Sequence, residues 1–139
     1  MRVVVDTSVW SLALRRRAGS LAPAEGRVRD ELTALVEEGR VVMLGIIRQE
    51  LLSGIKRAQA FEELREALRA FPDEPLVTDD HEEAARLANA CRGAGVAGGS
   101  VDFLIAAVAV RRRAPVFALD QDFQRYAKHA GLALHALRE

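Results

Sequence analysis

The strongest constraint in the sequence is a short apolar run, residues 100–110, that contains one charged residue, Asp102. A run of about ten apolar residues is too short to cross a bilayer, which takes roughly 20, so we expect no membrane association. The run instead predicts a helix buried on most sides, with Ser100 as its N-terminal cap. A carboxylate in such a helix needs a partner or a metal. The alternative is that Asp102 only helps to cap the first turn.

Composition limits what surrounds this helix. The 139 residues are enough for a sizeable core, and we expect one domain spanning residues 1–139. Apolar residues make up 50% of the chain and aromatic residues only 5%, which predicts an aliphatic core. The 20 basic and 20 acidic residues cancel, so any basic surface must be local. The single cysteine, Cys91, excludes an internal disulfide and a cysteine zinc site. No signal-peptide pattern is present, so we expect a cytoplasmic protein.

Short aliphatic runs alternate with helical patterns along the chain. The runs typical of buried strands are residues 2–5, 41–44, 74–77, 115–119 and 132–135. Helical patterns cover residues 7–12, 24–38, 45–54, 59–71, 78–91, 100–110 and 120–129. This alternation predicts a single α/β domain with a mainly parallel sheet of four to five strands flanked by helices.

Four acids stand out by their positions. Asp6 and Asp120 each follow a predicted strand, whereas Glu50 and Asp102 lie in helices that follow the sheet. If the two strands are neighbours, all four acids can point into one crevice at the carboxyl edge of the sheet. Four carboxylates that close cannot all stay ionised without a cation, and oxygen-only ligands favour Mg²⁺ or Mn²⁺ over zinc. Such a site is suited to metal-assisted phosphodiester hydrolysis. Taken singly, each acid can also be a helix cap or a solvent-facing side chain.

The sequence also resembles the PIN-domain family, and within it the VapC-type toxins of toxin–antitoxin pairs. The matching pieces, in order, are Val-Asp-Thr-Ser-Val-Trp (5–10), Glu-Leu-Leu-Ser-Gly (50–54), Asp-Phe-Leu-Ile-Ala-Ala (102–107) and Leu-Asp-Gln-Asp-Phe (119–123). The resemblance covers nearly the whole chain. It implies an endoribonuclease dependent on Mg²⁺ or Mn²⁺, usually a homodimer, acting on RNA and held inactive by a VapB-like antitoxin.

The resemblance also implies roles for single residues. The positions that match the catalytic acids of the family are Asp6, Glu50, Asp102 and Asp120. The metal would be held by Asp6, Asp102 and Asp120, joined by a fifth acid, Asp122. Ser8 would support the site by orienting Asp6 or a metal-bound water. The chain departs from many relatives at Ala118, where they carry a hydroxyl residue.

Two arginine triplets are local basic surfaces. They are either solvated helix ends or contacts for RNA phosphates. The candidates for RNA binding are Arg15, Arg16, Arg17, Arg111 and Arg113.

Three other functions compete with a toxin ribonuclease. A PIN-type nuclease of RNA processing or repair would have the same site but no antitoxin. A phosphoacceptor receiver domain also clusters acids at strand ends, but it needs an aspartate after its third strand and a later lysine. The only lysines, Lys56 and Lys128, do not fit that pattern. A non-catalytic binding module would use the acids only as caps and would bind no divalent ion.

Overall fold

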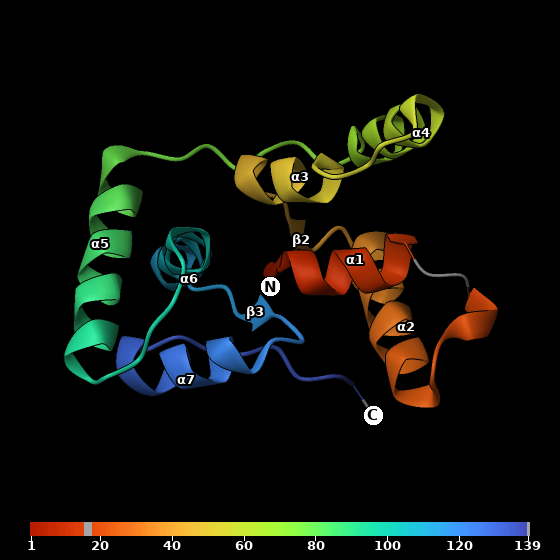
Figure 1. Cartoon of the computed structure of the whole chain (residues 1–139). Coiled ribbons are helices and arrows are strands. Elements are labelled where there is room, and N and C mark those ends of the chain that lie inside the picture. Colours follow the sequence, from red (N-terminus) through yellow and green to blue (C-terminus); the bar gives the residue numbers. More distant parts are fainter. Residues whose placement is uncertain (16–17, 139) are drawn as a thin grey trace.

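The structure is a computed structural model that describes residues 1–15 and 18–138. A parallel sheet lies among its helices (Figure 1). β1 (Val3–Val5) is the middle strand, with β2 (Val41–Val42) on one side and β3 (Val116–Phe117) on the other. The register pairs Val4 with Val42 and with Val116. All three residues of β1 are fully buried, which explains why this strand is a continuous apolar run rather than an alternating one.

The sheet is smaller than predicted. In the described residues it has three strands, whereas the sequence predicts four to five. The predicted strand at 74–77 does not form, and a single bridge joins Met43 to Asp73, the residue just before it. Pro72 and Pro75 flank this bridge, and proline has no N–H to donate to a ladder.

The predicted strand at 132–135 is also reduced to one bridge, between Val116 and Leu134. Val116 donates its N–H to Ala133 and accepts one from His135. Because β3 is only two residues long, it has little backbone with which to extend this pairing.

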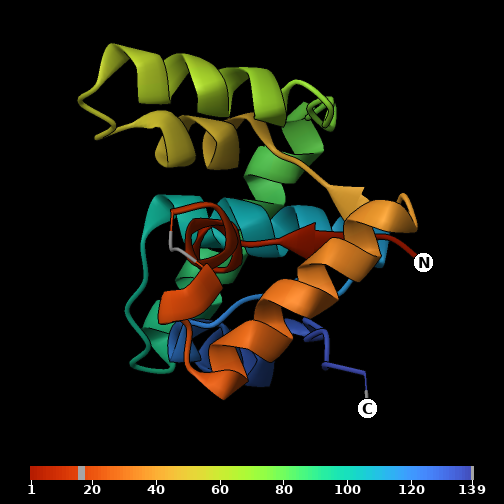
Figure 2. The same ribbon diagram turned by 90° about the vertical axis from the view of Figure 1, so that its right-hand side faces the viewer.

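Every predicted helix is present among the described residues. The α-helices are α1 (Thr7–Arg15), α2 (Pro23–Glu37), α3 (Gly45–Leu52), α4 (Ala58–Leu68), α5 (Thr78–Gly93), α6 (Ser100–Arg112) and α7 (Gln121–Ala130), with a short 3₁₀ turn η1 (Ala18–Ser20). In Figure 1, α5 and α6 lie to the left of the strands, and α1 and α2 lie to the right. Figure 2 shows α3 and α4 stacked as a pair above the rest of the chain. Within the described residues, no helix combines the length and the apolar character that crossing a membrane requires.

The predicted buried helix is α6, and it differs from the prediction at its start. Its buried residues are Phe103, Ile105, Ala106, Ala107, Val108 and Ala109. Ser100 is the first helical residue rather than the cap, because Gly99 takes the N-cap position and accepts the N–H of Phe103. At the other end Arg113 adopts a left-handed backbone with φ 54°, which stops the helix.

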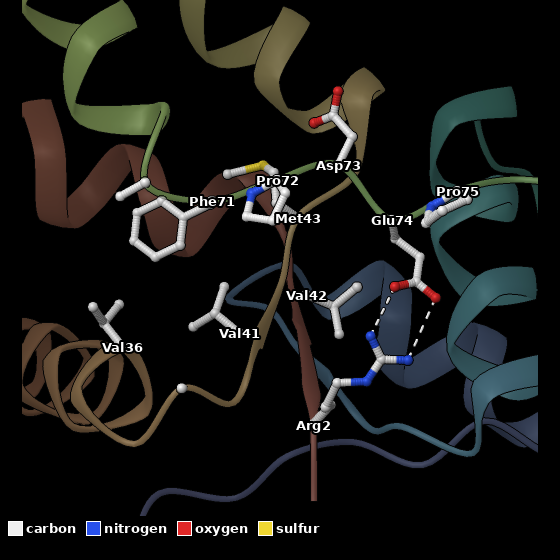
Figure 3. Close-up of a pocket in the computed structure, with 12 residues that line it drawn as sticks. Arg2, Val36, Val41, Val42, Met43, Phe71, Pro72, Asp73, Glu74 and Pro75 are labelled. Atoms are coloured by element: carbon white, nitrogen blue, oxygen red, sulfur yellow. Dashed lines mark hydrogen bonds and ion pairs between the residues drawn. The ribbon is translucent and has the colours of Figure 1, made fainter.

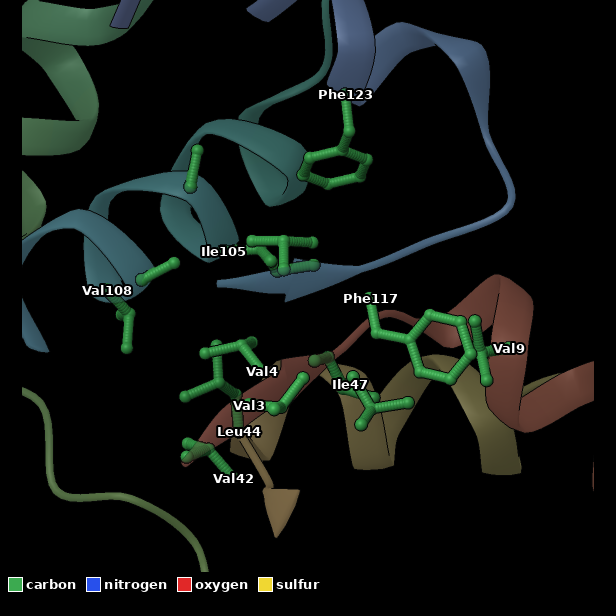
Figure 4. Packing of buried hydrophobic residues seen from close by; sticks show 14 of the residues in the cluster. Val3, Val4, Val9, Val42, Leu44, Ile47, Ile105, Val108, Phe117 and Phe123 are labelled. Carbon is green, nitrogen blue, oxygen red and sulfur yellow. The ribbon is translucent and has the colours of Figure 1, made fainter. Parts of the chain in front are cut away.

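The core is aliphatic, as predicted. Figure 4 shows Val4 of β1, Ile47 of α3, Ile105 of α6 and Phe117 of β3 gathered in one cluster. Cys91 is fully buried in this core.

An ion-pair network fixes α6 against the start of α5. Asp80 is fully buried and accepts hydrogen bonds from Arg111 (2.8 Å) and from Arg112. Arg112 also donates to Glu74 at 2.9 Å, and Glu74 pairs with Arg2 at 2.7 Å. The Arg112 guanidinium is the main reason that the pKa of Asp80 lies far below its ordinary value. This network holds the helix that carries Asp102.

Candidate active site

The carboxyl ends of β1 and β3 meet at one edge of the sheet. Asp6 follows β1 directly and donates its N–H to the carbonyl of Phe117, the last residue of β3, at 2.9 Å. The two strands are neighbours, which is the condition under which the predicted acids can share one crevice.

Three of the predicted acids form a tight group. Asp102, Asp120 and Asp122 each offer a carboxylate oxygen, and these three oxygens lie within 4.8 Å of one another. Asp102 comes from the first turn of α6, and the other two come from the start of α7. Asp120 is also the N-cap of α7, since its Oδ1 accepts the N–H of Asp122 at 2.8 Å. Its capping role and its place in the acidic group are therefore compatible.

Asp6 is held beside this group by Ser8. Asp6 is 6% exposed, and its Oδ2 accepts the Ser8 hydroxyl at 2.6 Å and the Ser8 N–H at 3.1 Å. The Ser8 hydroxyl in turn accepts the N–H of Leu119 at 3.0 Å. The backbone of Leu119 thus links the segment before Asp120 to Ser8. Ala118, where many relatives carry a hydroxyl residue, has a methyl side chain that cannot form such a hydrogen bond. Burial raises the pKa of Asp6, and the hydrogen bonds from Ser8 oppose that rise.

Glu50 is exposed and lies close enough to Asp6 for its charge to act on that carboxyl group. Its Oε1 accepts the hydroxyl of Thr7 at 2.6 Å, and its negative charge contributes to the raised pKa of Asp6. It is not a member of the three-carboxylate group. Thr7 was not singled out from the sequence, although its position beside Asp6 is a usable signal.

Asp102 is the most perturbed acid of the cluster. Burial, and then the charges of Asp6, Asp120 and Asp122, raise its pKa to about 6 from 3.8. The opposing contribution is a hydrogen bond from the hydroxyl of Tyr126, 3.2 Å from Oδ2. Sequence reasoning missed Tyr126. The available signal is that the only tyrosine of the chain lies one helical turn after Asp122.

The donor set fits a hard divalent cation. The group that could hold a metal consists of carboxylates, with no imidazole or thiolate among the described members, and oxygen donors suit Mg²⁺ or Mn²⁺. A carboxylate whose pKa is raised by like charges is one that a cation would stabilise in its ionised form.

Comparison with known proteins identifies the family. The PIN-domain model matches residues 3–129. The chain belongs to the PIN-domain family. A VapC ribonuclease of Mycobacterium bovis is 33% identical over 140 residues, a match covering 98% of this chain and 99% of the relative. This places the chain with the VapC-type PIN domains.

Solved structures share the fold of this PIN domain. VapBC2 from Rickettsia felis, bound to a DNA fragment from its promoter, aligns with a TM-score of 0.75 at 17% identity, covering 97% of this chain and 98% of that one. VapBC-5 from Mycobacterium tuberculosis, a member of the VapBC family of toxin–antitoxin systems, aligns with a TM-score of 0.64 at 22% identity over all of both chains.

The arginine triplets of this PIN domain are placed differently from the acids. Arg111 is in ion pairs with Asp80 and Asp79, at the end of α6 opposite Asp102. Arg113 is exposed. Arg16, Arg17 and the side chain of Arg15 lie outside the described residues, so RNA binding by the first triplet stays a prediction.

A separate hollow of about 560 Å³ opens beside β2 (Figure 3). Its lining includes Val41, Phe71, Pro72 and the ion pair between Arg2 and Glu74. None of the predicted site residues lines it. The chemistry of this PIN domain is therefore expected at the acidic edge of the sheet and not in this hollow.

Proposed function

We propose that the chain is a metal-dependent endoribonuclease and the toxin of a type II toxin–antitoxin pair. The observation that carries the proposal is the meeting of Asp102, Asp120 and Asp122, with Asp6 beside them, at one edge of a VapC-type PIN domain. The relatives named as VapC ribonucleases support RNA as the substrate.

The roles of the residues follow from their surroundings. Asp6, Asp102, Asp120 and Asp122 would hold the cation. A bound Mg²⁺ or Mn²⁺ would activate water and neutralise charge on the phosphodiester. Ser8 keeps the Asp6 carboxylate turned toward the cluster. Glu50, exposed and hydrogen-bonded by Thr7, would act as the proton acceptor for the water that attacks the phosphodiester.

The catalytic proposal is tested with the purified protein and total RNA. We expect cleavage with Mg²⁺ or Mn²⁺, none after chelation with EDTA, and recovery when Mn²⁺ is added back. Calorimetric titration of Mn²⁺ onto the protein without RNA gives an independent readout. A protein that binds no Mn²⁺, or that cleaves RNA equally well in EDTA, is not this nuclease.

The antitoxin is proposed to dock on an apolar groove between α1, α2 and α4. Two adjoining hollows, of about 320 and 510 Å³, share Leu14 and Ala67 in their linings. Leu14 is 41% exposed, and such an apolar side chain at the rim of a groove is suited to a partner. The VapBC structures with the same fold support a VapB-like antitoxin as that partner.

Coexpression with the adjacent small gene tests the partner and the homodimer together. We expect the two products to copurify. Size-exclusion chromatography should give the mass of a complex with two toxin chains. Leu14→Asp should release the partner without reducing Mn²⁺ binding. The control is Val77→Asp, because Val77 is 52% exposed and lies outside the linings of the groove; this variant should keep the partner bound. RNA cleavage by a protein that ignores the neighbouring product would instead favour a PIN-type nuclease without an antitoxin.

A further inference from the structure

Tyr126 is a buried aromatic residue whose polar end reaches the acidic cluster. It is 1% exposed, and its hydroxyl donates to Asp102 Oδ2 at 3.2 Å. The ring lies between Phe103 and Phe123, with ring centroids 5.0 and 5.4 Å away. Phe103 comes from the same turn of α6 as Asp102, and Phe123 comes from the same helix as Asp122. The aromatic packing therefore connects the two helices that supply the three grouped carboxylates.

We infer that Tyr126 is a positioning residue for the metal site, which orients the Asp102 carboxylate, and that Gly98 is required to leave room for its hydroxyl. The inference rests on the proposed metal-dependent function. Rotation of an aspartate carboxylate about its terminal torsion is only weakly restricted. A hydrogen bond from a ring that is itself fixed by packing restricts that rotation, and partners of this kind support metal ligands.

Gly98 carries the second observation. A Cβ atom at this position would lie 2.4 Å from the Tyr126 hydroxyl oxygen, 2.9 Å from Tyr126 Cε1 and 2.8 Å from Phe103 Cζ. The backbone of Gly98 does not have a positive φ, so backbone conformation does not explain the glycine. A Cβ on the next residue, Gly99, would meet nothing within 4 Å. The requirement for a missing side chain is thus specific to the position that faces Tyr126.

The first experiment removes the hydroxyl and keeps the ring. Tyr126→Phe should weaken Mn²⁺ binding about 10–100-fold, the usual effect of losing a partner of a metal ligand. Cleavage at saturating Mn²⁺ and RNA should fall as well, while the melting temperature without metal stays close to that of the wild type. Gln124→Ala, at an exposed position on the same helix, is the matched control and should leave Mn²⁺ affinity unchanged.

The second experiment displaces the hydroxyl from outside. Gly98→Ala should weaken Mn²⁺ binding, and Gly99→Ala should not. In the double variant Gly98→Ala/Tyr126→Phe, the loss should be smaller than the sum of the two single losses, because the closest clash involves the hydroxyl.

The outcomes separate this inference from the proposed function. A wild-type protein that binds no Mn²⁺ would overturn the metal site itself. Wild-type Mn²⁺ binding with an unchanged affinity in Tyr126→Phe would overturn only the positioning role. If Tyr126→Phe does not fold, the comparison of Gly98→Ala with Gly99→Ala decides, and equal Mn²⁺ affinities in these two variants would overturn the role of Gly98 and Tyr126.

Discussion

Ser8 and Leu119 are 111 residues apart in the sequence, and the N–H of Leu119 donates to the Ser8 hydroxyl at 3.0 Å. The same hydroxyl donates to Asp6 at 2.6 Å. One side chain therefore connects the end of β1 to the segment that leads into Asp120. This contact adds to the backbone hydrogen bond from Asp6 to Phe117 in fixing the placement of Asp6 relative to Asp120.

Ser8→Ala should weaken the metal site more than it weakens the fold. Loss of the hydroxyl leaves Asp6 free to rotate, and we expect Mn²⁺ affinity to fall about 10–100-fold. The contact with Asp6 is partly buried and the contact with Leu119 is exposed, so the free energy of unfolding should fall by only about 1 kcal/mol. Mn²⁺ calorimetry and urea unfolding measure the two effects. Ser8→Thr should restore affinity, and Ser11→Ala, in the same helix, is the control. Unchanged affinity in Ser8→Ala would contradict a supporting role.

Asp6→Asn and Asp102→Asn should abolish RNA cleavage without unfolding the protein. Each replacement keeps the shape of the side chain but removes a negative charge that the cation needs. Without metal, each variant should melt at the same temperature as the wild type or higher, because a cluster of like charges has lost one member. Cleavage assays and melting curves in EDTA test this. A variant that melts much earlier would make the carboxylate a part of the fold instead.

The stability of the metal-free protein should fall as the pH rises from about 4 to about 6. The pKa of Asp102 is about 6 in the folded protein, above its ordinary value of 3.8. Between these values the folded state holds more protons than the unfolded state, so ionisation destabilises the fold, and stability stays lower above this window. The raised pKa of Asp6 acts in the same direction.

Asp102→Asn isolates this effect. The wild-type and variant unfolding free energies, measured in EDTA across this pH range, should differ by an amount that changes with pH in the direction given above. The lowered pKa values of Asp80 and Glu74 act in the opposite sense as the pH falls below about 4, and they are common to both proteins. A difference that does not vary with pH would place the pKa of Asp102 near its ordinary value.

For the wild type, Mn²⁺ affinity should also fall below about pH 6, because protons compete for the carboxylate.

The sequence predicts the helices well and singles out the three grouped carboxylates of Asp102, Asp120 and Asp122, because both depend on local patterns. An apolar run with one carboxylate, as at Asp102, is visible without any tertiary information, and so is an acid directly after a valine strand, as at Asp6. The adjacency of β1 and β3 does not follow from the sequence, since strand order depends on how the helices pack. The sheet is smaller than predicted because Pro72 and Pro75 limit pairing around residues 74–77, and β3 offers only two residues for pairing with residues 132–135.

Tyr126 could not be found by a motif because its role depends on a contact across helices. Its partner, Asp102, is 24 residues away, and the distance between them is set by the packing of Phe103 and Phe123. The same is true of Arg111 and Arg112, for which the sequence leaves open a solvated helix end or a contact with RNA phosphates. Their partner, Asp80, lies in the first turn of α5 and also accepts the N–H of Val77 at 2.9 Å. The ion pair that joins them was not foreseen.

Arg112→Gln should destabilise the fold, which distinguishes it from an RNA-binding residue. Arg112 donates two hydrogen bonds to the fully buried Asp80 and one to Glu74. Removing one partner of a buried ion pair costs about 3–5 kcal/mol, and Arg111 still pairs with Asp80, so we expect about 3 kcal/mol. Urea unfolding measures the loss. A variant of wild-type stability would show that Arg111 alone satisfies Asp80.

Arg113→Gln tests RNA binding without disturbing this network. Arg113 is exposed and lies eleven residues beyond Asp102, roughly 16 Å along the helix at about 1.5 Å per residue. At that distance it cannot touch the metal, but it can reach a phosphate further along a bound strand.

If Arg113 makes one phosphate contact, Arg113→Gln should reduce the log–log salt slope of RNA binding by about 0.7, the value for single strands. Binding should be measured with Asp102→Asn as the background, so that RNA is not cleaved. In the protein with Asp102 intact, Arg113→Gln should change neither the stability nor the Mn²⁺ affinity. The reason is that glutamine adopts the left-handed backbone conformation of this position about as readily as arginine does. An unchanged slope would leave Arg113 as a solvated end of α6, where a positive charge favours the helix dipole.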